Sequence, residues 1–144
     1  MSDPMAIRVE IPAAELIDKI TILEIKRDRI GDQAKRDNVL RELDELYRVR
    51  DAAIRPSAEL HDLTHRLRTV NQILWDVEDQ IRICERRRDF GPEFIRLARN
   101  VYQNNDRRAD LKRQINAMLG SRLVEEKSYS CEGGEIQACH PNGL

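Results

Sequence analysis

Residues 60–84 read LHDLTHRLRTVNQILWDVEDQIRIC, and this stretch carries the clearest hydrophobic pattern of the 144-residue chain. Its apolar residues recur at alternating steps of three and four, which is the a/d pattern of a coiled-coil seam. The pattern predicts a helix over about 57–89 that is on the order of 45 Å long and needs an equally long apolar partner. The seam consists of Leu60, Leu63, Leu67, Val70, Leu74, Val77, Ile81 and Cys84.

The stretch that follows the seam is the predicted partner. Gly91–Pro92 ends the seam helix, and Pro92 suits the first turn of a further helix. This helix is predicted over about 92–119, and Gly120 ends it. The short connection implies that the two helices are antiparallel neighbours. The apolar residues of this helix form two patches, Phe94, Leu97, Ala98 and Val101, then Leu111, Ile115, Met118 and Leu119.

Two more helices are predicted before the seam, over about 13–30 and 32–55. Asp32 is expected to cap the second of them and Ser57 the seam helix, because both side chains accept hydrogen bonds from the first helical turn. The predicted fold is therefore an all-α antiparallel four-helix bundle, in which the last two helices form a long hairpin and the first two pack against it. The stripe on the first helix is Leu16, Ile17, Ile20, Leu23 and Ile30.

The two ends of the chain differ from this helical pattern. Ile7, Val9 and Ile11 alternate with polar residues, which indicates a short strand, and Leu123–Tyr129 is a second extended segment that could pair with it. We predict one helical domain over residues 1–129 and a disordered tail over 130–144, whose residues are small and polar.

The composition argues against several classes of protein. The chain holds 25 basic and 26 acidic residues for a net charge of −1, so we expect neither a nucleic acid nor a membrane surface as partner. No segment has the apolar length of a membrane span or a signal peptide. The three cysteines are an odd number, which favours a reducing compartment, and we expect a cytoplasmic protein.

Several segments resemble an uncharacterised family of short helical bacterial and phage proteins, a domain of unknown function. The opening motif Glu15–Lys26, ELIDKITILEIK, is the most specific of them, and the resemblance extends over most of residues 7–129. The family has no assigned activity, so the resemblance implies no mechanism. Its other segments are WDVED at 75–79 with Ile81 and Arg82, FIRLAR at 94–99, VYQNNDRR at 101–108 and EEKSY at 125–129.

Polar residues that fall within or beside the apolar stripes form the candidate site. Buried charges are costly unless they are paired, so these groups should meet one another, water or a ligand. One interpretation is a cleft that binds a small anion, with Glu78 or Glu24 as acid–base group. The other is a structural salt-bridge network that fixes the helix register. The predicted cluster is Glu24, Arg27, Glu78, Arg82, Asn105, Arg108 and Lys112.

Two enzyme classes can be compared with this cluster. Small helical chorismate mutases bind a dicarboxylate through inward Arg and Lys side chains, but the spacing around Arg27 does not reproduce their pattern. All-α nucleotide pyrophosphatases use paired acidic runs for magnesium, which resemble Glu42–Glu45 and Glu59–Asp62 here. The acidic residues Glu42 and Glu45, however, point away from the apolar stripe of their helix.

No metal site or cofactor is predicted. His61 and His65 lie one helical turn apart but lack a third ligand, and Cys131, Cys139 and His140 match no standard zinc spacing. No glycine-rich phosphate loop or nucleophile elbow is present in the sequence.

Trp75 is the candidate interface residue, because it lies off the seam and tryptophan is enriched at protein interfaces. It either packs against one of the first two helices or contacts a second copy. A long two-sided hairpin leaves surface to bury, so we predict a homodimer. The predicted function is a non-catalytic protein-interaction or scaffold module, and the alternative is a small-ligand or enzymatic site at the polar cluster.

Overall fold

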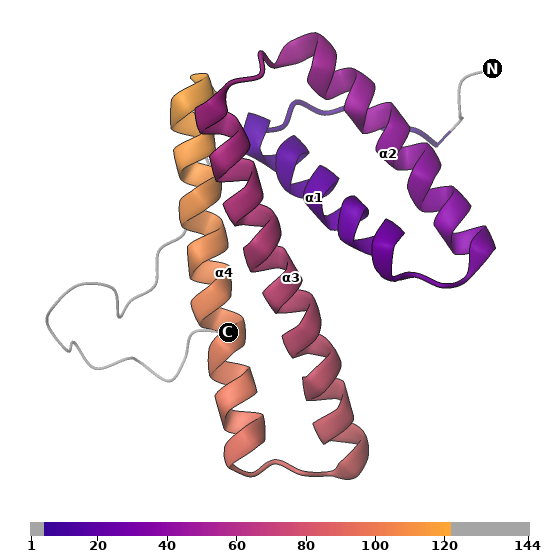
Figure 1. Cartoon of the computed structure of the whole chain (residues 1–144), viewed down its shortest axis with the longest axis vertical. Coiled ribbons are helices and arrows are strands. Elements are labelled where there is room, and N and C mark those ends of the chain that lie inside the picture. The colour runs from indigo at the N-terminus through magenta and orange to yellow at the C-terminus, as the bar shows by residue number, and fades with distance from the viewer. Residues whose placement is uncertain (1–4, 122–144) are drawn as a thin grey trace, which may run out of the picture.

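A computed structural model describes residues 5–121, and this part of the chain is all-helical, with four helices and no strand. Helix α1 spans Ala13–Arg29, α2 spans Gln33–Ala53, α3 spans Ala58–Arg87 and α4 spans Pro92–Leu119. The predicted number and order of helices are confirmed within the described residues (Figure 1).

The helix ends follow from local chemistry. The side chain of Asp32 accepts a hydrogen bond from the Lys35 amide at 3.0 Å, and Ser57 accepts one from the Leu60 amide at 3.1 Å. Both bonds satisfy an amide that has no partner within the first turn of its helix. Gly120 ends α4 at φ 63°, a left-handed conformation that glycine adopts without steric cost.

The core is divided among three apolar clusters that follow the helix pairs. One cluster joins α1 to α3 and α4 and includes Ile17, Leu67 and Ile115. A second joins α1 to α2 through residues such as Ile20 and Leu43. The third lies between α3 and α4 alone and comprises Val77, Cys84 and Leu97, with partly buried neighbours. Helix α1 therefore buries side chains in two directions, whereas α2 buries one narrow stripe.

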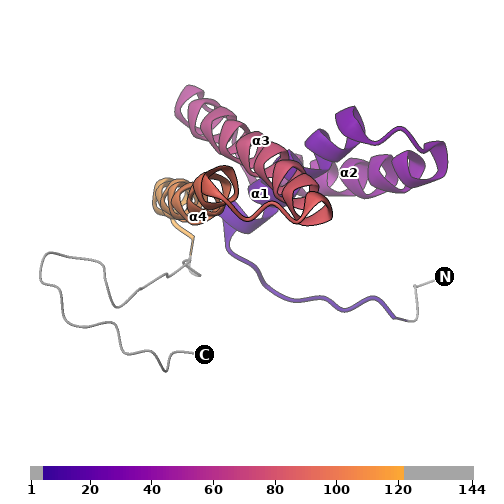
Figure 2. The ribbon, with the colours of Figure 1, turned by 90° about the horizontal axis from the view of Figure 1, so that it is seen from below.

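The helices are arranged as two hairpins, α1–α2 and α3–α4, instead of the predicted four-helix bundle. Helix α1 packs against each of the other three, while α2 packs against α1 alone (Figures 1 and 2). The buried residues of α2 are Val39 and Leu43, which face α1 and leave α2 no apolar side for the other hairpin. The bundle arrangement is thus not confirmed.

The α3–α4 hairpin projects beyond the first hairpin. Helix α1 has 17 residues and α3 has 30, so α1 covers about half of the length of α3. In Figure 1 the α1–α2 hairpin lies beside the upper half of α3 and α4, and the lower half extends past it.

The predicted strand at Ile7–Ile11 is not supported. These residues have no regular secondary structure and are exposed, and Leu123–Tyr129, the predicted pairing segment, lies outside the described residues, as does the tail over 130–144. A strand needs a partner to satisfy its backbone groups, and the described residues provide none here. Over residues 5–121, the structure contains no helix with the length and apolar character needed to span a membrane.

Candidate functional site

A buried carboxylate, Asp18 of α1, lies at the point where α1 crosses the α3–α4 hairpin. Its side chain is 1% exposed. Asn71 of α3 donates its Nδ2–H to Asp18 Oδ1 at 2.9 Å, and Arg108 of α4 donates its Nε–H to the same oxygen at 3.0 Å. The Arg108 Nη2 group donates to Asp18 Oδ2, so the guanidinium contacts both carboxylate oxygens. One side chain of α1 is thus held by both helices of the other hairpin.

Two more side chains complete this arrangement. The Thr21 hydroxyl accepts a second hydrogen bond from Asn71 at 2.9 Å and donates to the Asp18 carbonyl at 2.8 Å. Lys112 of α4 is 4% exposed and places Nζ 2.6 Å from Glu15 Oε2 and 3.7 Å from Asp18 Oδ2. We call the set Glu15, Asp18, Thr21, Asn71, Arg108 and Lys112 the Asp18 network.

The charges of the Asp18 network cancel, since two carboxylates face one guanidinium and one ammonium group. A buried charge that is paired and hydrogen-bonded is tolerated, whereas an isolated one is not. The geometry therefore matches a structural network that holds α1 across the hairpin.

Five of the residues that the sequence singled out line one groove between α1, α3 and α4. We call it the Trp75 groove, and its volume is about 440 Å³. Trp75 is half-buried and lines this groove together with Ile22 and Ile25 of α1. The five are Trp75, Glu78, Arg82, Asn105 and Arg108.

Both arginines of the Trp75 groove already have carboxylate partners. Arg82 Nη2 lies 3.7 Å from Glu78 Oε2, one helical turn away, in an exposed pair. Arg108 contacts Asp18, as described above. Asn105 is half-buried at the groove wall, whereas its neighbour Asn104 is 5% exposed and donates its Nδ2–H to the Asn100 carbonyl at 2.9 Å.

Glu24 and Arg27 do not join the other predicted residues. Glu24 accepts hydrogen bonds from Arg68 of α3 at 2.7 Å and from the Tyr47 hydroxyl of α2 at 3.0 Å. Arg27 donates to its neighbour Asp28 at 3.0 Å, and this hydrogen bond raises the pKa of the Arg27 guanidinium. Burial, together with the hydrogen bond to Glu24, raises the pKa of Tyr47 above its ordinary value of 10.0. The predicted single cluster is therefore divided between two places.

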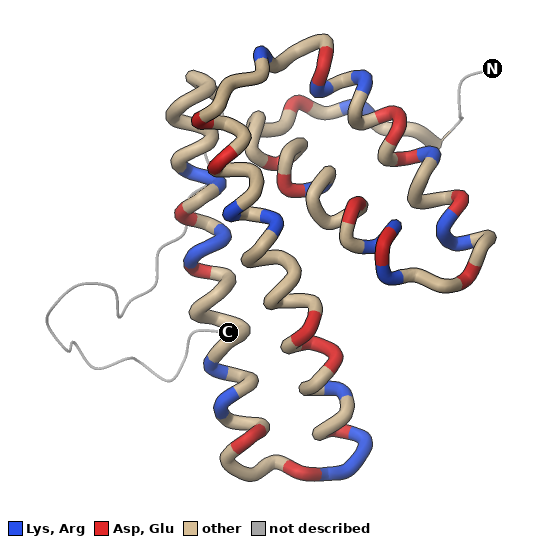
Figure 3. Tube along the Cα trace, viewed as in Figure 1, with Lys and Arg blue, Asp and Glu red and all other residues tan. Residues whose placement is uncertain are grey.

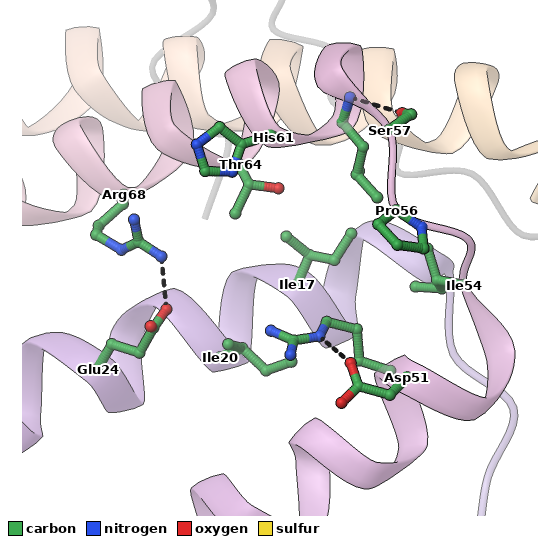
Figure 4. A pocket seen from close by; sticks show the side chains of 12 residues that line it. Ile17, Ile20, Glu24, Asp51, Ile54, Pro56, Ser57, His61, Thr64 and Arg68 are labelled. Carbon is green, nitrogen blue, oxygen red and sulfur yellow. Dashed lines mark hydrogen bonds and ion pairs between the residues drawn. The ribbon is translucent and has the colours of Figure 1, made fainter.

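A second concavity lies between α1, the end of α2 and the start of α3. We call it the Ile54 groove, and its volume is about 560 Å³. Figure 4 shows Ile17, Ile20 and Ile54 around it, with the ion pair Glu24–Arg68 at one end. Arg50 and Asp51 also line the groove and form an ion pair. His61 and Thr64 of α3 form the opposite wall. The sequence analysis had not predicted this groove.

Sequence reasoning also missed Glu15, Asp18 and Thr21. Asp18 lies on a second stripe of α1 that consists of Ala14, Ile17, Asp18, Thr21 and Ile25 and is buried throughout. The sequence did contain a pattern that could have revealed Asp18. The other residues of this stripe are small or apolar and recur at steps of three and four, which is typical of a buried helix face. The predicted stripe of α1 is divided, because Leu16, Ile20 and Leu23 pack against α2, whereas Ile17 packs against α3 and α4.

The acidic runs, histidines and cysteines considered as metal ligands do not form a site within the described residues. Among residues 5–121, no group of three or more His, Cys, Asp and Glu side chains is placed to hold a metal ion, so the two acidic runs do not combine into a carboxylate cluster. Glu42 instead forms an exposed ion pair with Lys19 at 3.2 Å. His65 is exposed, and Cys131, Cys139 and His140 lie outside the described residues.

Comparison with known proteins yields one match. The model of a family described as "Family of unknown function (DUF6165)" matches residues 7–141. The match continues past Tyr129, where the resemblance seen in the sequence had ended. No match was found among the curated proteins or among the solved structures.

Proposed function

The chain belongs to the DUF6165 family, whose function is unknown, and from the packing of its helices we propose that it is a non-catalytic protein-interaction module. In this proposal the projecting half of the α3–α4 hairpin is the surface that binds a helix of a partner protein. Apolar faces of exposed helices commonly serve this role.

The observation that carries the proposal is the exposed apolar surface of the projecting half. Helix α1 ends near Asp76, which accepts a hydrogen bond from Arg29, and the apolar cluster beyond this point contains residues of α3 and α4 alone. Ile95 and Tyr102 lie seven residues apart, hence on one face of α4, and both are more than half exposed. Ile83 and Phe90 add exposed apolar side chains on α3 and at the tip.

The charge distribution supports the same proposal. Each of the four helices carries both acidic and basic residues (Figure 3), so no helix of the described chain has charges of one sign only, as a nucleic-acid site commonly has. The buried charged groups of the Asp18 network neutralise one another, as expected of a structural element rather than of a catalytic centre.

We further propose that the protein is a cytoplasmic homodimer. The support for self-association is the amount of apolar surface that a single copy leaves exposed, both on the projecting hairpin and on residues 5–11. The odd number of cysteines supports a reducing compartment.

Site-specific photo-crosslinking tests the interaction surface. A photoreactive phenylalanine analogue is placed at Tyr102 or, as a control, at the exposed Arg41 of α2, in cells that express the protein. We expect a defined adduct from the Tyr102 position alone.

Binding of the purified partner is then measured by calorimetry. Ile95→Glu should weaken binding about tenfold or more, because a charge would be buried in the contact. Gln72→Glu, at an exposed glutamine of α3 outside the projecting half, should have little effect. Equal adducts at both positions, or unchanged binding in Ile95→Glu, would refute this surface.

A second function, binding of a small anionic ligand, is favoured by the Trp75 groove, where Arg82, Arg108 and Asn105 converge. A thermal-shift screen against anionic metabolites tests it, since a ligand that binds the folded state raises the melting temperature. Arg82→Gln is the suitable variant, because Arg82 lines the groove and its pair with Glu78 is exposed. A shift that disappears in Arg82→Gln would support the ligand site over the interaction module, and no shift across the panel would argue against it.

A further inference from the structure

Residues 5–11 form an extended arm on which Ile7 and Val9 are largely exposed and Ile11 is partly exposed. Ile7, Val9 and Ile11 are 84%, 74% and 44% exposed. Because these residues alternate with Arg8 and Glu10, an extended conformation places all three on one side of the arm. The arm therefore carries an apolar strip along one side and charged groups along the other.

The root of the arm is fixed. The Ala14 amide donates to Asn116 Oδ1 at 2.8 Å and the Ala13 amide donates to Ser121 Oγ at 3.3 Å, which ties the start of α1 to the end of α4. Pro12 is extended, with φ −58° and ψ 147°, and a residue that precedes proline, here Ile11, is sterically held in extended conformations. Two successive extended residues direct the arm away from α1, and Figure 2 shows it leaving the helices. The arm is thus poorly placed to fold back onto its own α1.

The Ile54 groove offers the matching surface. Its apolar lining consists of the half-buried Ile54 over the largely buried Ile17, Ile20 and Leu60, an aliphatic set that suits an aliphatic strip. Its edges carry two acidic and two basic side chains in the pairs Glu24–Arg68 and Arg50–Asp51. The charged side of the arm, with one arginine and one glutamate, would meet an edge of no net charge, so no electrostatic repulsion opposes docking.

We propose that the arm of one copy lies in the Ile54 groove of a second copy, and that the second copy reciprocates. A two-fold exchange of identical segments uses the same contact twice and closes the assembly at two copies. This inference rests on the proposed homodimer and names its contact; it does not depend on the docking surface of the projecting hairpin.

Sedimentation analysis of two matched double variants tests the role of the arm. Ile7→Ser with Val9→Ser removes the apolar strip, whereas Arg8→Ser with Glu10→Ser changes the opposite side of the same arm. We expect the first to raise the dimer dissociation constant about tenfold or more and the second to leave it within about threefold. A monomeric wild-type protein would refute the homodimer and the arm contact together. A wild-type dimer that both variants leave intact would refute the arm contact alone.

Disulfide crosslinking tests the groove. Cysteine is introduced at Val9 in one copy and at Thr64, on the wall of the Ile54 groove, in a size-tagged second copy, with Cys131 and Cys139 replaced by serine. We expect the mixed disulfide to form on oxidation. A disulfide between two copies that both carry Val9→Cys would indicate that the two arms pair with each other. A disulfide within a single chain that carries both Val9→Cys and Thr64→Cys would indicate that the arm occupies the groove of its own copy. Either result without the mixed disulfide would overturn the proposal.

Discussion

Asp18 accepts hydrogen bonds from α3 and α4 while belonging to α1, so a single carboxylate connects the two hairpins. Removing the carboxylate would take one acceptor from Asn71 and one from Arg108, although Asn71 would keep its hydrogen bond to Thr21 and Lys112 its ion pair with Glu15. The cost of such a change exceeds the strength of the contact itself, because the remaining groups keep their desolvation penalty.

We predict that Asp18→Ala lowers the free energy of unfolding by about 3 kcal/mol, the low end for breaking a buried ion pair, because Arg108 is partly exposed. Urea unfolding followed by circular dichroism measures the change. Asp28→Ala is the matched control, since Asp28 is an exposed carboxylate on the same helix and should cost about 0.5 kcal/mol or less. Equal losses in the two variants would show that the Asp18 network contributes no special stability.

Tyr47 gives the molecule a predicted sensitivity to alkaline pH. Its pKa is raised in the folded state by burial and by Glu24, so the unfolded chain loses the phenolic proton at a lower pH than the folded chain. The contribution to stability is fully present below the unfolded pKa of 10.0 and is lost as the pH rises through the folded pKa.

In Tyr47→Phe, the free energy of unfolding should therefore fall less steeply above about pH 10 than in the wild type. Urea titrations at several pH values above about 10 measure how steeply the free energy of unfolding falls with pH. Tyr102→Phe, at an exposed tyrosine, serves as the control. Parallel slopes in all three proteins would contradict the raised pKa of Tyr47.

At the scale of the helices, the seam between α3 and α4 is apolar at both ends and polar in the middle of α4. Leu97 and Val101 precede Asn104 and Arg108, and Leu111 follows them at the same spacing. Arg108 meets Asp18, but the Oδ1 atom of Asn104 is buried and has no hydrogen-bond partner within the described residues. An asparagine at such a position fixes the register of paired helices at a cost in stability.

Asn104→Leu should accordingly raise the free energy of unfolding by about 1 kcal/mol, because an unsatisfied buried oxygen is replaced by an apolar group of similar size. Chemical denaturation checks this, and Asn105→Leu, at the half-buried wall of the Trp75 groove, should change stability less. A loss of stability in Asn104→Leu would indicate that Oδ1 has a partner in solution, such as a bound water.

For the whole molecule, the division into two hairpins implies uneven stability. The region around Asp18 has three helices in contact, whereas the projecting half of α3–α4 is held by the small cluster of Val77, Cys84 and Leu97. Local opening requires less free energy where fewer apolar contacts must be broken.

Hydrogen exchange followed by mass spectrometry should show this difference. We expect amides of residues 83–100 to exchange about tenfold or more faster than those of residues 63–74 in the same α3–α4 hairpin. Uniform protection along the hairpin at concentrations where the protein is monomeric would contradict this expectation. Added protection of residues 83–100 in the presence of a partner would indicate binding at the projecting half.

The positions of the four helices and of their ends follow from local sequence patterns. The caps and breaks act within one or two helical turns, and the seam is a repeat of steps of three and four, so each can be recognised without knowledge of the packing. They are the seam of residues 60–84, the caps Asp32 and Ser57, and the breaks at Gly91–Pro92 and Gly120. Which face of α1 packs against which helix depends instead on long-range contacts. Helical periodicity gives the direction in which Asp18 and Arg27 each leave the helix axis, but it does not say which other helix lies in that direction. Asp18 became the buried partner of Arg108 because α2 occupies the Leu16–Ile20–Leu23 side of α1, and that choice depends on contacts between residues far apart in the chain.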